Sequence, residues 1–533
     1  MDSETFEAAK EPDCMQDVSR VQTMQPGGRE MKMSGTEELT APLQAGYLAT
    51  FGYRQELPRS LGRFSAFAAG FSFISILTTA FQLFGLGYSF GGSRFFWTWP
   101  IVFAGQLLVA LCFAELASRY PLAGSVYQWA KHVGGGFTGW LAGWLMLIGC
   151  VLAFGAAAIA LQVVLPSLWQ GFQITGSDPS ITSSSGATNA VFLGLILIAF
   201  TTSANAAGVR VVSWINNIGV IAEIAGLAVL LGGLALAAAR GPDVVVTNHH
   251  PHQTVSPGTA GLLMAALMPA YVMYGFDNAA SVAEETIAAR KTAPRAILRA
   301  LALSGMIGLA LLLLSLMAAP SLTDGELATI GLPYIIASVF DETLGKILLA
   351  DVALAVMVCT LTIQTGTVRL FYAMGRDGML PCSTFLAKVN ARTGAPVWPA
   401  VISGVLASGM LLVNLGNPTL FAVLTGTSVV VVYMAYLLIT APLLLQRLRG
   451  RYPSAEPGQF SLTRYGLAIN LAAVTYGLLM AVNIAWPRHE VYDPAGSGQW
   501  WSLLFPVEFV AAATCAGWMC WLFKRRRHAA ARR

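Results

Sequence analysis

Residues 262–286 read LLMAALMPAYVMYGFDNAASVAEET. The stretch begins as an apolar run, but after about twelve residues it reaches polar positions and an acid, Asp277. One helical crossing of a bilayer takes about 20 residues, so the helix must either carry the polar residues into the membrane or break there. Pro269 removes a backbone donor, and Gly275 tolerates irregular backbone angles. The stretch therefore predicts a membrane helix that breaks near Gly275.

Polar side chains follow the predicted break. Asn278 and Ser281 offer hydrogen bonds to the backbone groups that a broken helix leaves free. Such a break is tolerated in a membrane only where it is buried in protein or lines water, and a charge at that depth costs about 2.5–3.5 kcal/mol. We therefore expect Asp277 to face a cavity. The alternative is that Asp277 caps the cytoplasmic end of a straight span.

The composition is that of a polytopic membrane protein. Of 533 residues, 55% are hydrophobic and 11% are charged, and the mean hydropathy is +0.62. Soluble domains carry about 25% charged residues, and no soluble core could bury this much apolar surface. The net charge of +5 comes from basic residues in short loops between apolar runs, where they report orientation in a membrane. We expect the lipid bilayer as a partner and no nucleic acid.

No cofactor, metal or catalytic site is expected. The seven cysteines include no CxxC pair, and most lie in or beside apolar runs, so we expect buried thiols without disulfides. His249, His250 and His252 share a loop that offers no cysteine or acid at the spacing of metal ligands. The HExxH, P-loop and GxSxG motifs of enzymes are absent, as are the pore-lining repeats of channels. An enzyme and a channel are therefore the remote alternatives.

The apolar runs predict an all-α membrane protein. Each run is long enough for a membrane helix and is bounded by loops that contain polar residues, glycine or proline. The twelve segments are residues 64–90, 97–118, 136–165, 188–207, 213–239, 258–281, 296–319, 332–371, 397–414, 418–444, 465–485 and 500–523.

Charge asymmetry predicts the orientation. If the N-terminus is cytoplasmic, the basic residues that remain outside are Arg94, Arg240, Lys346 and Arg488, whereas the inside loops hold most of the others. We therefore expect a multi-pass protein of the plasma membrane with both termini in the cytoplasm. Residues 1–57 mix charges with Gly, Pro, Ser and Thr and predict a disordered cytoplasmic tail; residues 526–533 form a basic cytoplasmic tail.

The first apolar segment has the same irregularity as the sixth. Ser75, Thr78 and Thr79 place hydroxyls in the middle of the run. Interrupted first helices in two five-helix halves are typical of inverted-repeat transporters whose site lies at the membrane midplane. The alternative is that these hydroxyls bond the carbonyls of their own helix.

Three blocks carry a resemblance to a known family. They are AELASRYPLAGSVYQW at 114–129, GFD followed by AEET between 275 and 286, and RLFYAMGRDGMLP at 369–381. With them, residues 58–525 resemble the amino acid/polyamine/organocation (APC) permeases, in the branch that includes GABA, amino-acid and choline permeases. The resemblance implies a LeuT-like fold of two inverted five-helix halves, about 64–239 and 258–444, with two helices added at 465–485 and 500–523.

The resemblance also implies a function and a site. It implies a secondary active transporter that imports an amino acid, or a related amine such as GABA, by alternating access. The implied binding segments are Ser75, Ile76, Leu77, Thr78, Thr79 and Ala80 in the first span and Tyr274, Gly275, Phe276 and Asp277 in the sixth. The first segment lacks the Gly-x-Gly of many amino-acid permeases, which favours an elongated substrate or a cation. A choline or polyamine permease and an amino-acid exchanger are the alternatives.

Ion coupling has two candidate sites in the sequence. Glu223 lies in the middle of the fifth segment, where a buried acid can bind a proton. A sodium ion would instead use carbonyls of the first segment and hydroxyls of the eighth, from Thr360, Thr362, Thr365 or Thr367. Glu223 could also simply pair with Asn or Ser across helices.

Charged residues at segment ends are the gate candidates. Glu115 lies one helical turn from Arg119, and Pro121 ends that helix. Glu284 and Glu285 lie near Arg290, Lys291 and Arg295 in the sequence, so we expect them to be solvated or paired at a gate. The alternative for Glu115 is a salt-bridged helix end without a role in transport.

Overall fold

The computed structural model describes residues 47–530 except 182, 248, 250–257, 414, 417–419 and 493–499. Three parts of the sequence interpretation lie outside the described residues: residues 1–46 of the predicted tail, His250 and His252 of the histidine loop, and residues 531–533. The chain forms two compact units, divided between Tyr53 and Arg54. In the first unit, the described residues form one helical turn, where the rings of Tyr47 and Phe51 meet edge to face at 5.1 Å. The second unit carries everything described below.

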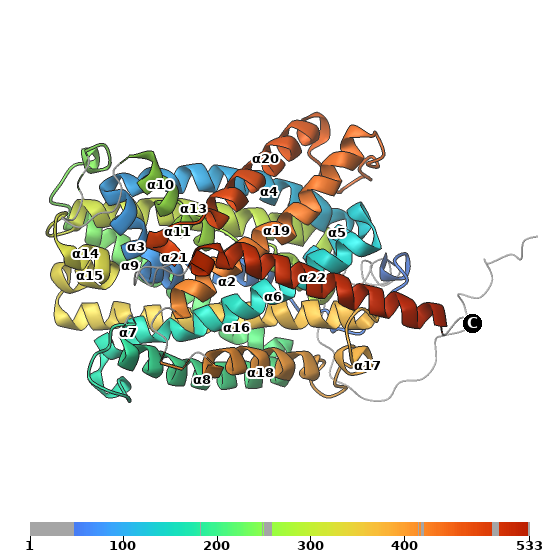
Figure 1. Ribbon diagram of the computed structural model, residues 1–533, viewed down its shortest axis with the longest axis horizontal. Coiled ribbons are helices and arrows are strands. Elements are labelled where there is room, and N and C mark those ends of the chain that lie inside the picture. Colours follow the sequence, from blue (N-terminus) through green and yellow to red (C-terminus); the bar gives the residue numbers. More distant parts are fainter. Residues whose placement is uncertain are drawn as a thin grey trace, which may run out of the picture. The chain divides into compact units, whose positions relative to one another are not determined.

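The second unit is built from helices (Figure 1). The described residues form no strand; they contain one isolated bridge, between Leu61 and Thr286. The long helices are α4 (Thr98–Arg119), α6 (Gly136–Ile159), α8 (Ser184–Ala207), α9 (Val209–Leu236), α13 (Ala289–Ala318), α16 (Glu342–Arg376), α18 (Val397–Val413), α19 (Leu420–Leu448), α20 (Gly466–Ala485) and α22 (Trp500–Ala530).

Shorter helices connect or interrupt the long ones. The short α-helices are α2 (Arg63–Ile74), α3 (Ile76–Gly91), α5 (Ser125–Gly134), α7 (Leu161–Leu168), α10 (Thr259–Ala265), α11 (Leu267–Val272), α12 (Asn278–Ser281), α14 (Gly325–Thr329), α15 (Leu332–Val339), α17 (Ser383–Leu386) and α21 (His489–Tyr492). The 3-10 helices are η1 (Gly92–Trp97), η2 (Gln170–Phe172), η3 (Pro242–Val245), η4 (Ala283–Glu285) and η5 (Thr463–Tyr465).

Nine helical stretches of the described chain are long and apolar enough to cross a membrane. The first, Arg63–Arg119, has 57 residues and contains two of the segments expected from the sequence. Because one crossing takes about 20 residues, this stretch exceeds what a single span needs. Two further apolar helices are shorter, Thr259–Val272 and Val397–Val413. The all-helical membrane fold expected from the sequence is therefore confirmed at this level.

One predicted segment is wrong in its extent. Residues 332–371 were expected to form a single helix, but α15 ends at Val339 and α16 begins at Glu342. Asp341 adopts an extended backbone between them, and its side chain accepts hydrogen bonds from Thr343 N and Leu344 N at 3.1 and 3.2 Å. Asp341 is thus an N-cap inside an apolar run, and capping by an acid starts a new helix there.

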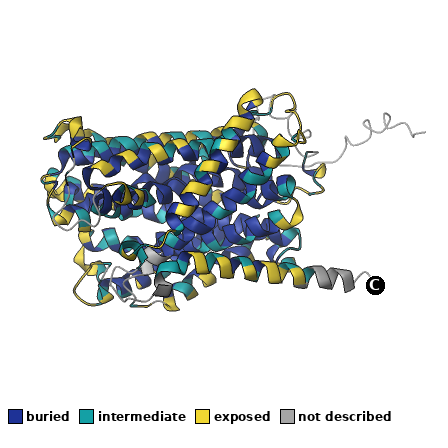
Figure 2. Cartoon of the chain, turned by 45° about the horizontal axis from the view of Figure 1, so that its top comes forward, coloured by how far each residue is buried: buried dark blue, intermediate teal, exposed yellow. Residues whose placement is uncertain are grey.

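Large apolar side chains cover the outside of the helices. Ile196 on α8, Ile221 on α9 and Leu479 on α20 are each at least 60% exposed. Figure 2 shows the buried residues in the middle of the helical unit, with exposed residues along its outer helices. A soluble protein rarely exposes contiguous apolar surface, whereas lipid is a suitable solvent for it. The outer face of the unit is therefore the face that meets the bilayer.

The buried centre lies where the two interrupted helices meet α16. α2 packs against α9, α12, α13 and α16, while α3 packs against α10, α11 and α16. The long helix α16 also packs against α6, α8 and α9, so it runs beside both interruptions. Segments distant in the sequence are thereby brought to one place inside the unit (Figure 1).

Candidate functional site

Ser75 interrupts the first helix. Its φ of 35° and ψ of 90° end α2 and start α3 on a new axis. A residue other than glycine held at positive φ costs about 1–3 kcal/mol and persists only where its surroundings fix it. Here Ser75 N donates to Phe71 O at 2.8 Å, and Ser75 Oγ lies 3.0 Å from Glu223 Oε1.

A carboxylate from α9 covers the start of α3. Leu77 N donates to Glu223 Oε1 at 3.3 Å, and Glu223 is 1% exposed. The first N–H groups of a helix have no partner within it and carry a partial positive charge, so they favour an anion. The Glu223 carboxyl group occupies that position, and it also pairs with Ser75 across helices.

The second interruption runs from Met273 to Asp277, between α11 and α12. Gly275 has φ +84°, and a Cβ there would lie 1.9 Å from the Phe73 ring. Gly275 is therefore required both by the backbone and by the close approach of the first helix. Its N–H donates to the hydroxyl oxygen of Tyr436 at 3.0 Å, and the same hydroxyl donates to Asp277 Oδ1.

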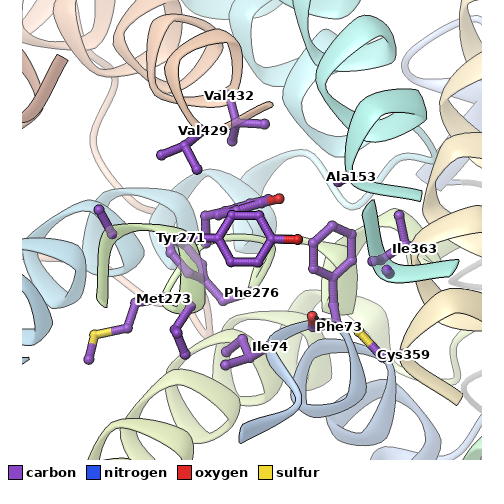
Figure 3. Packing of buried hydrophobic residues seen from close by; sticks show 14 of the residues in the cluster. Phe73, Ile74, Ala153, Tyr271, Met273, Phe276, Cys359, Ile363, Val429 and Val432 are labelled. Atoms are coloured by element: carbon purple, nitrogen blue, oxygen red, sulfur yellow. Dashed lines mark hydrogen bonds between the residues drawn. The ribbon is translucent and has the colours of Figure 1, made fainter. Parts of the chain in front are cut away.

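A narrow pocket lies between the two interruptions. Its walls come from α2, α3, α6, α11, α16 and the break before α12, and none of its lining side chains is charged. The lining residues are Phe73, Thr78, Thr79, Gln82, Ala157, Tyr271, Tyr274, Cys359 and Ile363. Figure 3 shows how Phe73, Tyr271 and Cys359 converge there from separate helices. We call it the central pocket.

The binding residues implied by the resemblance are distributed around this pocket. Thr78, Thr79 and Tyr274 line it. The other seven residues are buried near the two interruptions but are not among its lining residues: Ser75, Ile76, Leu77, Ala80, Gly275, Phe276 and Asp277.

Gln82 is the polar lining residue that the sequence interpretation missed. Both polar atoms of its amide are buried, and neither has a hydrogen-bond partner among the described residues. A buried amide without partners costs free energy, so the pocket wall offers a donor and an acceptor that no described residue satisfies. One signal was available in the sequence, because Gln82 lies one helical turn after Thr78.

The side chain of Asp277 does not cap a helix. It occupies the N-cap position of α12, but its side chain makes no cap hydrogen bond, and it is 2% exposed. Its oxygens accept from Tyr436 and, at 3.3 Å, from Ser125 Oγ. The helix that it was thought to cap is moreover broken, so the straight-span interpretation does not describe this structure.

The four threonines of α16 are not gathered at the first interruption. Thr360, Thr365 and Thr367 donate to carbonyls one turn back in α16, at 2.6–2.8 Å. Thr362 donates to Asn216 Oδ1 on α9 at 3.0 Å, and Thr365 also lies 2.9 Å from Asn205 Oδ1 on α8. Their hydroxyl hydrogens therefore serve helix packing.

Buried ion pairs join the second interruption to the end of α16. Glu284 accepts from both terminal nitrogens of Arg376 at 2.9 Å, and Glu285 lies 3.1 Å from Arg369. The sequence left these acids either solvated or paired at a gate. The solvated alternative is wrong, because both side chains are buried and each pairs with an arginine of α16.

A third acid pairs with the end of α19. Glu115 contacts Arg447, whereas its neighbour Arg119 is 3.9 Å away. The guanidinium carbons of Arg119 and Arg447 lie 4.4 and 4.5 Å from the centroid of the Tyr452 ring. Burial raises the pKa of the Tyr452 phenol above its usual value. We call the three acids with Arg369, Arg376 and Arg447 the ion-pair layer.

The segment before α2 is bonded to this layer. Ser60 N and Leu61 N donate to Glu285 O at 3.0 and 2.9 Å, and Ile287 N donates to Leu61 O at 2.9 Å. The hydroxyl of Tyr372 donates to Glu56 Oε2 at 3.0 Å. Residues from Glu56 onward are therefore part of the folded unit.

A family model described as amino acid permease matches residues 61–507 of the 533-residue chain. The chain belongs to the amino acid permease family, within the APC permeases. The match spans both interruptions, the central pocket and the ion-pair layer, so the permease family accounts for most of the second unit.

Individual relatives agree with this assignment. The permease is 28% identical to amino-acid permease BAT1 of Arabidopsis thaliana, over 86% of this chain and 92% of the relative. It is 27% identical to the BAT1 homolog of Oryza sativa subsp. japonica, over 83% of this chain and 88% of the relative. It is 26% identical to amino-acid permease 2 of Neurospora crassa, over 84% of this chain and 82% of the relative. These are membrane transporters and not enzymes, as the sequence predicted.

The unpartnered amide gives a first testable prediction. Gln82→Leu keeps the side-chain volume and removes two buried polar atoms without partners, so the melting temperature in detergent should not fall. Amino-acid uptake into proteoliposomes should fall about five- to 150-fold, because losing a substrate hydrogen bond costs about 1–3 kcal/mol. Gln170→Leu, on the exposed η2, is the matched control. Unchanged uptake by Gln82→Leu would show that this amide does not contact substrate.

The contact between the interruptions gives a second prediction. Gly275→Ala places a methyl group against the Phe73 ring at positive φ and should destabilise the fold by roughly 2–5 kcal/mol, seen as a lower melting temperature. Gly232→Ala on α9 has open space around it and should leave the melting temperature unchanged or slightly raised. Equal melting of the two variants would contradict the contact.

Proposed function

We propose that this permease is a secondary active transporter that imports an amino acid, or a related amine such as GABA, by alternating access. The observation that carries the proposal is the central pocket between two interrupted helices, with the Gln82 amide at its wall and no partner for it among the described residues. Interrupted helices bring polar groups to membrane depth, which suits the polar ends of a small substrate. The names of the plant and fungal relatives support an amino acid as cargo.

The proposed architecture is LeuT-like, with twelve spans. The interruption at Ser75 lies in the first expected segment and the one at Gly275 in the sixth, five segments apart, as two inverted halves at about 64–239 and 258–444 require. Helices α20 and α22 then correspond to the two additional spans, 465–485 and 500–523. The permease domain is 58–525, between the tails 1–57 and 526–533.

We place the permease in the plasma membrane with both termini in the cytoplasm. The positive-inside rule supports this orientation, since the loop with Arg290 and Lys291 then lies inside, as does the ion-pair layer at the ends of α16 and α19. The pairs Glu284–Arg376 and Glu285–Arg369 and the acid Glu115 then close the cytoplasmic side and must separate for release. Separating buried pairs is costly, which suits a gate that opens only at one stage of the cycle.

Glu223 is the proposed proton-coupling group. It contacts both Ser75 and the backbone of α3, so a proton on its carboxyl weakens charge-assisted hydrogen bonds at the first interruption. The competing sodium scheme would draw on Thr360, Thr362, Thr365 and Thr367, whose hydroxyls donate within α16 or to asparagines of α8 and α9. A choline or polyamine permease and an amino-acid exchanger are the alternatives on the same fold.

The proposal is tested by transport and by Glu223→Gln. Labelled amino acids and GABA should accumulate in wild-type proteoliposomes under an imposed pH gradient. Glu223→Gln mimics the protonated acid, so counterflow exchange should persist while accumulation is lost. A potential of 100 mV is worth about 2.3 kcal/mol per charge, or roughly fiftyfold in accumulation. Glu326→Gln, at an exposed acid of α14, is the control.

Other outcomes separate the alternatives. If Glu223→Gln still accumulates substrate under a pH gradient and sodium removal stops uptake, sodium coupling replaces proton coupling. If no labelled amino acid or GABA enters and choline does, the organocation alternative holds. If wild type shows exchange and no accumulation under any gradient, the protein is an exchanger.

The orientation gives a separate prediction. Single cysteines at Lys291 and Lys346, both exposed, are introduced into a chain whose own cysteines are replaced. An impermeant thiol reagent applied to intact cells should label Lys346→Cys and leave Lys291→Cys unlabelled until the cells are opened. The reverse pattern would invert the topology.

A further inference from the structure

A second pocket lies beside the central one. It is lined by Phe73, Ser125, Val126, Met146, Cys150, Asp277, Asn278, Ser281, Gly366 and Leu370. Phe73 belongs to the linings of both pockets, so the two pockets meet at this residue. Leu370 is adjacent in sequence to Arg369 of the ion-pair layer, which puts the second pocket on that side of the central one.

Asn278 has an acceptor without a partner in this pocket. Its Nδ2 donates to Ala69 O at 3.1 Å and to Thr362 O at 3.3 Å, so both amide hydrogens are used and the orientation of the amide is fixed. Its Oδ1 is buried and has no hydrogen-bond partner among the described residues. This oxygen lies over Gly366, where an added Cβ would be only 2.1 Å away. Because Gly366 has no side chain, the space that Asn278 Oδ1 faces stays open.

The neighbouring groups are also acceptors. Asp277 Oδ2 accepts from Ser125 Oγ at 3.3 Å, and Ser125 Oγ lies 3.1 Å from Ser281 Oγ. In the part of the chain that the structure describes, no Lys, Arg or His forms an ion pair with Asp277. Three hydroxyl hydrogens, those of Ser125, Ser281 and Tyr436, therefore serve both oxygens of a carboxylate, an amide oxygen and two serine oxygens, and the pocket still has an excess of acceptors.

This donor and acceptor balance matches one chemical group. A primary ammonium carries three N–H donors, no acceptor and one positive charge, so it would satisfy Asn278 Oδ1 and pair with Asp277. The central pocket has no charged lining residue and cannot supply such a pair. An isolated carboxylate buried without a cation is unfavourable, which gives the pocket a preference for a charged occupant.

We propose that the second pocket is a further substrate site, in which Asp277, Asn278, Ser125 and Ser281 receive the primary ammonium group of the cargo. The substrate reaches it from the central pocket by displacement of Phe73, on the way to the ion-pair layer. This inference rests on the proposed function in one respect, that the cargo carries a primary amine.

The test uses ligands that separate the two ends of a zwitterion. The melting temperature of the purified full chain in detergent is titrated with GABA, n-butylamine and butyrate. GABA and butylamine should raise it and butyrate should not. Asp277→Asn should weaken the apparent affinity for butylamine at least tenfold, because a charge-assisted hydrogen bond is lost. Asp351→Asn should titrate like wild type, which also controls for effects of the amine on the micelle.

Ser281→Ala provides a milder variant should Asp277→Asn fail to fold. It removes one acceptor and should weaken butylamine binding several-fold, whereas Ser72→Ala, a buried serine that lines neither pocket, should not. The proposal is overturned if butylamine leaves the wild-type melting temperature unchanged, or if Asp277→Asn and Ser281→Ala bind butylamine as wild type does. It is also overturned if sodium chloride raises the melting temperature of wild type but not of Asp277→Asn, while butylamine raises neither.

Failure of the proposed function is distinguishable from failure of this site. Stabilisation by butylamine that depends on Asp277, with no uptake of any labelled amino acid or GABA, would support the site and remove the proposed function. Uptake that depends on Gln82 but is unaffected by Asp277→Asn would support the proposed function and remove the site.

Discussion

The rest of the structure depends on backbone groups that two interrupted helices leave without helical partners at membrane depth. Lipid offers them no hydrogen bond, so the protein must supply each one. Glu223 accepts from Leu77 N, and Tyr436 accepts from Gly275 N. Asn278 donates to carbonyls of α2 and α16. Side chains from α9 and α19 thus each satisfy a backbone donor at one interruption, and the helices that carry them must stay where they are.

This requirement explains why polar residues are buried in an otherwise apolar unit. Asn278 leaves part of its hydrogen-bonding capacity over, because its Oδ1 has no partner among the described residues. The side chain that bonds carbonyls of α2 and α16 therefore also lines the second pocket. A substitution at Asn278 is expected to lower stability, because both bonds to these carbonyls are lost.

The sequence predicted the helical membrane fold and both interruptions, because apolar length and the local chemistry of Ser75 and Gly275 are visible in a single segment. It did not predict the contacts between distant segments. Gln82 was not singled out in the sequence, and no partner was assigned to Glu284, which pairs with Arg376, 92 residues away. The start of α16 was missed because Asp341 caps a helix within an apolar run.

The ring of Phe73 rests on the bare Cα of Gly275, and this contact joins the two interruptions mechanically. A shift of one broken helix displaces the other by steric contact alone. Such transmission is not screened by dissolved ions and does not change with acidity. The ion-pair layer is held by charges, and its strength depends on the local dielectric. The molecule therefore contains two kinds of linkage between its helices, one steric and one electrostatic.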